Sequence, residues 1–168
     1  IAALRAALDD VRASIRYVVR SRAREIPTGV VALDADIAGN PMEGDNTATG
    51  LLQTLNEQGF MVELLPYDAA QLSRANRPRV VDTLSPRFGD RVERVILASG
   101  RIEEFNESDG FIVTVTGSAE VYNLDTGRNI YATEQDQRSR GSSSSGAMSA
   151  AFRSLGNKLA EDLANNLP

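Results

Sequence analysis

The first residues of this chain with the types and spacing for chemistry are acidic side chains around position 40. Asp34, Asp36, Gly39 and Asp45 fall at positions 1, 3, 6 and 12 of a calcium-binding loop, where oxygen ligands surround a hard cation and glycine allows a sharp bend. Position 5 is Ala38, which offers no side-chain ligand, and a predicted strand precedes the loop where such sites have a helix. The pattern therefore leaves two interpretations, a cation site built on Asp34, Asp36 and Asp45 or a solvated acidic loop.

A second stretch, Asp125-Thr126-Gly127, is the tripeptide of aspartic peptidases, in which two carboxylates share one proton to activate water. Those enzymes follow the glycine with a small residue, whereas Arg128 follows here, and the tripeptide joins two predicted strands. Aspartate and glycine are also common turn residues. We therefore interpret this stretch as a hairpin turn.

The third stretch is the serine-rich run at residues 138–155, "RSRGSSSSGAMSAAFRSL". Gly141 and Gly146 have the glycine spacing of a phosphate-binding loop, but Ala147 stands where that loop needs lysine. Two interpretations remain. Arg138 and Arg140 hold an anion at the start of the helix that follows, or the serines form a loop that caps this helix.

The composition excludes several classes of protein. The chain has no histidine and no cysteine, so Ser-His-Asp or Cys-His catalysis and thiolate metal sites are impossible, and an enzyme would depend on carboxylates, tyrosines or Lys158. A net charge of −5 and a pI near 4.8 argue against a general nucleic-acid binder. No apolar run approaches the roughly 18 residues that span a bilayer. We expect no cofactor.

The chain opens with a predicted amphipathic helix over residues 1–26. Its apolar positions recur every three or four residues, and Pro27 prevents the helix from continuing; they are Ile1, Leu4, Leu8, Val11, Ile15 and Val18. Such a stripe either packs on a sheet or forms a seam for self-association. The remainder, residues 27–168, is predicted to be one α/β domain.

Patterning within the domain predicts its order of elements. A strand at 30–37, a helix that Asp45 or Asn46 caps and Gly59 ends, and a strand at 60–66 make a βαβ unit. Helical segments at 68–76 and from Pro78 to about Gly89 follow, then three strands at 91–105, 110–124 and 128–139 and a closing helix at 147–167. The predicted fold class is α/β (α+β), a mixed sheet with an antiparallel meander, packed by helices that include long N- and C-terminal ones.

Three stretches resemble a known group of bacterial envelope domains. They are "GVVALDADI" with "TATGLLQTLNEQGFMVELLPYDAAQL", then "RVILASGRIEEF", and finally residues 117–163 with their turn, return strand, serine loop and closing helix. The group includes the curli secretion-channel lipoprotein, the penicillin-binding-protein activator lipoproteins and the N-terminal domain of TolB. The resemblance covers about residues 28–167 and implies an α/β sandwich with an accessory role.

From this resemblance we expect a non-enzymatic periplasmic or outer-membrane-associated (lipo)protein domain, an assembly or activator factor that binds another envelope protein or itself. Membrane contact is expected only through an N-terminal anchor outside this sequence, and no nucleic acid is expected. Because arginine and aromatic residues dominate protein contacts, Tyr122, Tyr131, Arg138 and Arg140 are the predicted partner contacts. The alternatives are a homo-oligomeric subunit of a secretion or flagellar-base assembly and a cation- or small-ligand-binding module.

Overall fold

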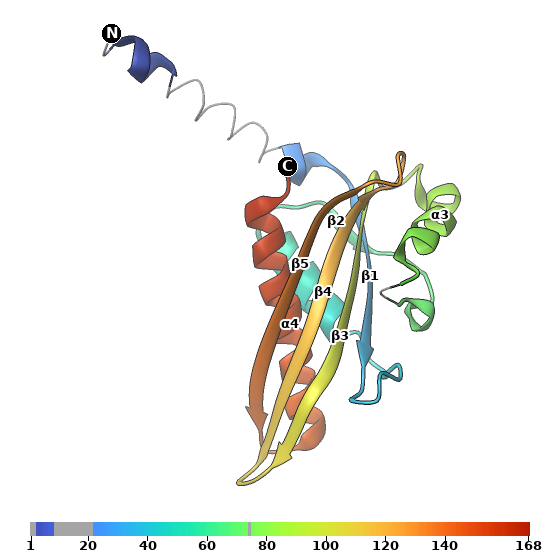
Figure 1. The fold of residues 1–168 in the computed structure, drawn as a ribbon, viewed down its shortest axis with the longest axis vertical. Helices are drawn as coiled ribbons and strands as arrows, with labels where there is room; N and C mark the ends of the chain where they lie inside the picture. The colour runs from blue at the N-terminus through green and yellow to red at the C-terminus, as the bar shows by residue number, and fades with distance from the viewer. Residues whose placement is uncertain (1–2, 9–21, 74) are drawn as a thin grey trace.

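Alternating apolar residues build a five-stranded mixed sheet, shown in Figure 1. The computed structural model describes residues 3–8, 22–73 and 75–168. The strands lie in the order β2-β1-β3-β4-β5, with β1 parallel to both of its neighbours and the other pairs antiparallel. Their bounds are Thr28–Ala35 for β1, Val62–Leu64 for β2, Arg94–Glu107 for β3, Phe111–Asn123 for β4 and Asn129–Gly141 for β5.

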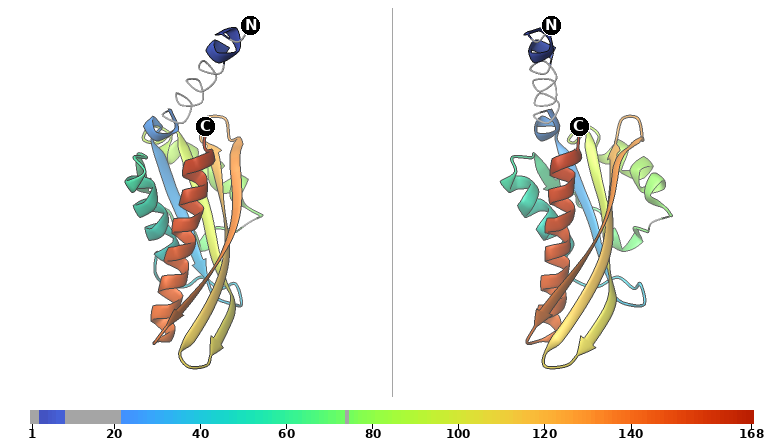
Figure 2. Two further views of the ribbon diagram at one scale, coloured as in Figure 1. Left: turned by 90° about the vertical axis from the view of Figure 1, so that its left-hand side faces the viewer. Right: turned by 60° about the vertical axis from the view of Figure 1, so that its left-hand side comes forward.

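Helices cover the two faces of the sheet unequally. The helices α2 (Asn46–Glu57) and α4 (Ser144–Asn166) pack on one face, while a 3₁₀ turn, η1 (Ala69–Gln71), and α3 (Arg77–Phe88) lie on the other (Figure 2). The α4 helix buries an apolar stripe at helical spacing against the sheet; its members include Ala151, Leu155, Leu159 and Leu163. Two hydrophobic clusters result, one on each side of the sheet.

The helices α2 and α4 contact each other through two glycines. A Cβ atom on Gly50 would lie 2.3 Å from the backbone oxygen of Arg153, and one on Gly156 would lie 2.3 Å from that of Thr47. Real side-chain atoms do not approach so closely, so only glycine allows the two backbones to meet.

Strands β3, β4 and β5 extend beyond the cover of α3 and form an arm with one exposed face (Figure 1). Strand β1 pairs with β3 only as far as Arg101, while β4 pairs with β3 up to the hairpin at its end. We call the uncovered surface on the α3 side of the arm the open face. Its residues are Arg101, Glu104 and Asn106 of β3, Thr114 and Thr116 of β4, and Glu134, Asp136, Arg138 and Arg140 of β5.

The predicted fold class is confirmed, with local differences. The first strand lies two residues earlier than predicted, and the closing helix begins at Ser144 because the Ser143 hydroxyl accepts a hydrogen bond from the Gly146 amide at 3.1 Å. The serine run thus caps the helix and supplies its first turn. The predicted helical segment at 68–76 is only the single turn η1, where the Asp68 carboxylate accepts from the Ala70 amide.

The N-terminal helix is described only in part. Residues 3–8 and 22–25 are helical, whereas the prediction for 1–2 and 9–21 lies outside the described residues. Leu4 and Leu8 are 67% and 51% exposed, so this part of the predicted stripe does not pack on the domain. Ala23, in contrast, is buried in the core, and Arg24 stacks 5.0 Å from the centre of the Phe60 ring. Over the described ranges, no helix combines the length and apolar character needed to cross a membrane.

Candidate functional site

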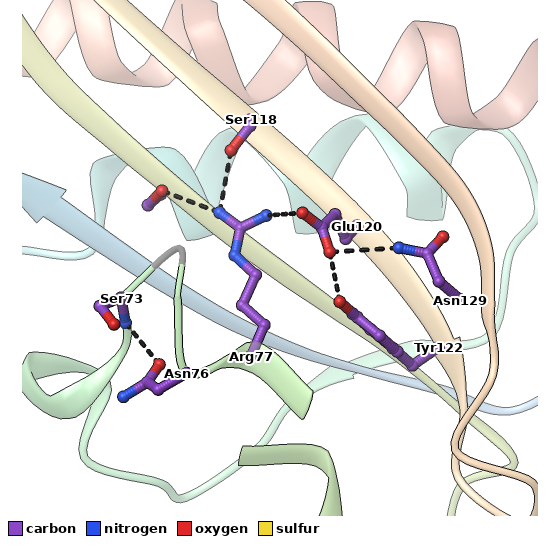
Figure 3. Close-up of polar contacts among 8 residues, drawn as sticks. Ser73, Asn76, Arg77, Ser118, Glu120, Tyr122 and Asn129 are labelled. Carbon is purple, nitrogen blue, oxygen red and sulfur yellow. Dashed lines mark hydrogen bonds and ion pairs between the residues drawn. The ribbon is translucent and has the colours of Figure 1, made fainter. Parts of the chain in front are cut away.

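A buried arginine lies where α3 meets the sheet (Figure 3). Arg77 is fully buried in the first turn of α3, and one guanidinium nitrogen, Nη2, donates to Ser99 Oγ at 3.0 Å and to Ser118 Oγ at 2.9 Å. The other terminal nitrogen, Nη1, lies 3.0 Å from a carboxylate oxygen of Glu120. Because a buried charge requires a partner, this ion pair explains how α3 can hold a guanidinium against the sheet.

The other carboxylate oxygen of Glu120 completes the network. It accepts hydrogen bonds from the Tyr122 hydroxyl and, at 3.1 Å, from the Asn129 side-chain amide (Figure 3). Burial, followed by the hydrogen bond to Glu120, raises the pKa of Tyr122 and keeps its hydroxyl protonated as a donor. The network therefore ties α3, β3, β4 and the start of β5 together.

A cavity of about 460 Å³ opens on the arm beside this network, at the border between the open face and the cover of η1 and α3. Ser99 and Ser118, the two serines bonded to Arg77, line it together with Arg101, Thr116 and Glu134. None of these five lining residues was predicted from the sequence. The available signal for this site was an arginine at a buried position of α3. Its partners could not be identified in the same way, because they come from strands that are distant in the sequence.

The four predicted partner contacts have different surroundings in the structure. Tyr122 is only 5% exposed and belongs to the core on the α3 side, so its predicted role as a surface contact is wrong in this fold. Tyr131 is half-buried, and its hydroxyl donates to Asp162 of α4 at 2.9 Å. Burial and this hydrogen bond raise the pKa of Tyr131. The hydrogen bond itself holds β5 against α4.

Arg138 and Arg140 are exposed on β5, but not beside the start of α4. Tyr131 and Gly141 of the same strand contact α4, and side chains alternate between the two faces of a strand. Arg138 and Arg140 therefore lie on the open face, while the N-terminus of α4 lies behind the sheet. The anion site predicted between these arginines and the helix N-terminus is not formed.

The three acidic residues of the predicted cation loop have different surroundings. Asp34 is 3% exposed at the end of β1, and its carboxylate accepts from the amides of Asn46 (3.0 Å) and Thr47 (3.3 Å). Asp36 instead accepts from amides within its own loop, and Asp45 makes no side-chain cap bond. Within the described ranges, no group of three or more acidic side chains is placed to hold a metal ion.

Asp34 thus caps α2 from the preceding strand, whereas the sequence pattern predicted Asp45 or Asn46 as the cap. Burial raises the pKa of Asp34, and the hydrogen bonds from the two amides oppose this shift. We expect Asp34→Ala to lower the free energy of unfolding by about 1–2 kcal/mol, because a buried amide and a partly buried amide lose their acceptor.

The exposed Asp45 is the matched control, since Asp45→Ala removes the same side chain where it makes no cap bond. Its effect should stay within about 0.5 kcal/mol in urea unfolding followed by circular dichroism. Equal effects of the two substitutions would contradict the assignment of the cap to Asp34.

The Asp125-Thr126-Gly127 tripeptide forms the predicted turn between β4 and β5. Gly127 has a φ of 71°, and the Asn123 side chain accepts hydrogen bonds from the amides of Asp125 and Thr126 at 2.9 and 3.1 Å. The tripeptide therefore has the geometry of a tight turn stabilised by an asparagine side chain.

Comparison with known families gives a match over most of the domain. The family described as "TP0693-like lipoprotein, C-terminal domain" matches residues 27–164. The chain belongs to the TP0693-like lipoprotein family. This match confirms the resemblance to envelope lipoproteins that the sequence predicted, and it coincides with the α/β domain described above.

Solved structures share the fold of this TP0693-like domain. A chain of the PelC dodecamer from Paraburkholderia phytofirmans is 16% identical, with a TM-score of 0.57 over 84% of this chain and 89% of that one. The hypothetical protein CT253 from Chlamydia trachomatis is 11% identical, with a TM-score of 0.50 over 84% and 98%. No curated protein sequence matches the chain.

Proposed function

We propose that this chain is a non-enzymatic accessory domain of the bacterial cell envelope that works by binding another protein. The observation that carries the proposal is the match of residues 27–164 to a lipoprotein family. A lipid anchor on the precursor would hold such a domain at a membrane surface, where an assembly or activator factor meets its partner.

The open face is the surface that suits this role best. It carries three arginines and three acidic residues. The pairing of the strands fixes the positions of these side chains relative to one another. A surface with both signs of charge favours a specific partner over a generally charged polymer, because each charge must meet its opposite. Arg138 and Arg140, at the far end of this face, remain our proposed contacts.

Photocrosslinking in the cells that encode the protein tests this proposal. Arg138 and Arg140 are replaced one at a time by p-benzoylphenylalanine in the full-length precursor, with the exposed Glu161 on the outer side of α4 as the matched control position. We expect one discrete adduct from positions 138 and 140 and none from 161. Equal labelling at all three positions, or no adduct at 138 and 140, would contradict the proposed contact surface.

Self-assembly is the second candidate, because a chain with this fold forms the PelC dodecamer. The same experiment separates the two candidates. An adduct at twice the mass of the chain, containing only this sequence, favours a homo-oligomer, and light scattering on the purified full chain should then give a mass above that of one protomer. A heavier adduct with a second sequence favours the accessory role.

A further inference from the structure

The outer edge of β5 has the features of a site for an added strand. β5 is the last strand of the sheet that the described residues form, and it runs for 13 residues. In such a strand, the backbone amide and carbonyl of every second residue point away from the sheet. The edge therefore offers a row of donors and acceptors to another extended segment.

Asp136 shows which residues of β5 turn their backbone groups to this edge. It lies opposite Thr116 of β4, but its carbonyl accepts from the Lys158 side chain at 3.2 Å and so points away from β4. Backbone direction alternates along a strand, and the pairing with β4 is regular over residues 132–141. Arg138 therefore also turns its amide and carbonyl to the edge, and both residues carry their side chains on the open face.

The order of charges along this edge is complementary to itself. Asp136 is followed on the same face by Arg138 and Arg140, with one residue between successive charges. A second copy of β5 can lie antiparallel across the edge with the two Gln137 residues opposite each other. Asp136 of each copy then faces Arg138 of the other, whereas a parallel pairing in the same register would place each charge opposite its like.

The backbone supports the same register independently of the charges. Residues that face each other across an antiparallel pair exchange two hydrogen bonds only if both turn their backbone groups to the shared edge. Asp136 and Arg138 both do so. One register therefore satisfies the charges and the backbone together.

We propose that β5 joins two copies of this chain edge to edge, in an antiparallel pair with its two-fold axis at Gln137. The same surface of each copy meets in such an interface. Its ion pairs join Asp136 of each copy to Arg138 of the other; Glu134 interacts within its own chain and is not counted among them. Lys158 is exposed, so it can leave the Asp136 carbonyl to the incoming backbone amide. The inference rests on the self-assembly candidate above and names its contact surface.

Charge reversals test the pairing by sedimentation equilibrium of the full chain. From about 10 µM to 1 mM, we expect the mass to rise from the 18.1 kDa of one chain toward twice that value. Asp136→Arg and Arg138→Asp each place like charges opposite each other and should weaken dimerisation by about tenfold or more. The double variant restores opposite charges and should restore the dimer. Arg153→Asp reverses an exposed charge on α4 and should leave the dimer unchanged, and thermal unfolding of each variant checks that it is folded.

A single introduced cysteine tests the register, because the sequence has no cysteine of its own. Gln137→Cys places the two thiols opposite each other in a pair whose Cα atoms lie about 4.5 Å apart, within reach of a disulfide. Ser139→Cys is the matched control on the same face of β5, but its two copies would lie roughly 13 Å apart. Under mild oxidation, we expect a covalent dimer from Gln137→Cys and no more than about a tenth as much from Ser139→Cys.

Three results would overturn the inference: a chain that stays monomeric up to about 1 mM, equal disulfide formation at positions 137 and 139, or a double charge variant that dimerises as weakly as the single ones. The proposed accessory role depends instead on an adduct with a second sequence in cells. A monomeric chain that gives this adduct would overturn the pairing and leave the accessory role in place. A dimer that gives no such adduct would do the reverse.

Discussion

Replacing Glu120 with glutamine is expected to lower the free energy of unfolding by about 3–5 kcal/mol. The substitution keeps the shape of the side chain but removes the charge 3.0 Å from the guanidinium of Arg77, which is fully buried. An arginine cannot remove the cost of an unpaired buried charge by losing its proton, because arginine side chains stay protonated in proteins. A loss of this size is a large share of the roughly 5–15 kcal/mol that stabilises a typical domain.

The exposed pair between Arg91 and Glu63 provides a matched control. Its nitrogen and oxygen lie 2.7 Å apart, but the two side chains are 53% and 40% exposed, so Glu63→Gln should change the free energy of unfolding by less than about 1 kcal/mol. Both variants are compared by urea unfolding. Equal effects of Glu120→Gln and Glu63→Gln would contradict a dominant role for the buried pair.

A double-mutant cycle tests the pairing itself. Arg77→Met leaves Glu120 with a side chain that is 22% exposed, so water can solvate the remaining charge, and we expect a loss of about 2–3 kcal/mol. Combining Arg77→Met with Glu120→Gln removes both charges, and the double variant should be more stable than the sum of the two losses implies. Simple additivity would mean that the two residues do not act as a pair.

Adding one methyl group at Gly156 is expected to lower the free energy of unfolding by about 2–3 kcal/mol. On an exposed helix the same Gly→Ala change would stabilise the protein by roughly 1 kcal/mol, because alanine favours the helix. Here the new Cβ atom would lie 2.3 Å from the backbone oxygen of Thr47 and 2.9 Å from the amide of Leu51, so α4 must move away from α2. The sign of the effect therefore reports whether the two backbones touch.

Urea unfolding of three variants, two at Gly156 and one at an exposed control position, measures this effect. Gly156→Val should be less stable than Gly156→Ala, whereas Ala150→Val on the exposed side of α4 should cost less than about 1 kcal/mol. A stabilising Gly156→Ala would show that the helices lie further apart than described above.

Local patterns predicted most of the fold. Strands β3 to β5 and the helix α4 were expected from period-two and helical spacing, since each pattern is decided by neighbours in the sequence. The predicted helix at 68–76 is only one turn, because the backbone becomes extended at Leu72 and the Asn76 side chain bonds to the backbone of Gln71 and Ser73. Residues 3–8 form a helix, as predicted, but their apolar side chains are exposed. An apolar stripe at helical spacing predicts a helix, but it does not indicate which surface covers that stripe.

Long-range contacts explain why the candidate site was not predicted. Arg77 bonds to Ser118, 41 residues further along the chain, and nothing in the sequence around either residue indicates the other. Asp34 caps a helix that begins 12 residues later, although the residues beside that helix looked like better caps. Tyr122 was predicted to be a surface contact from its residue type, but strand register directs it into the core.

The sequence by itself determined the order of elements, the lack of imidazole and thiol chemistry and the resemblance to envelope lipoproteins, because these depend on composition and on local patterns. Only the tertiary structure decided which charges are buried, which face of β5 carries Arg138 and Arg140, and that Ser99, Ser118 and Arg101 line one cavity. These features follow from strand register and from the packing of α3 on the sheet, which bring together residues that are distant in the sequence.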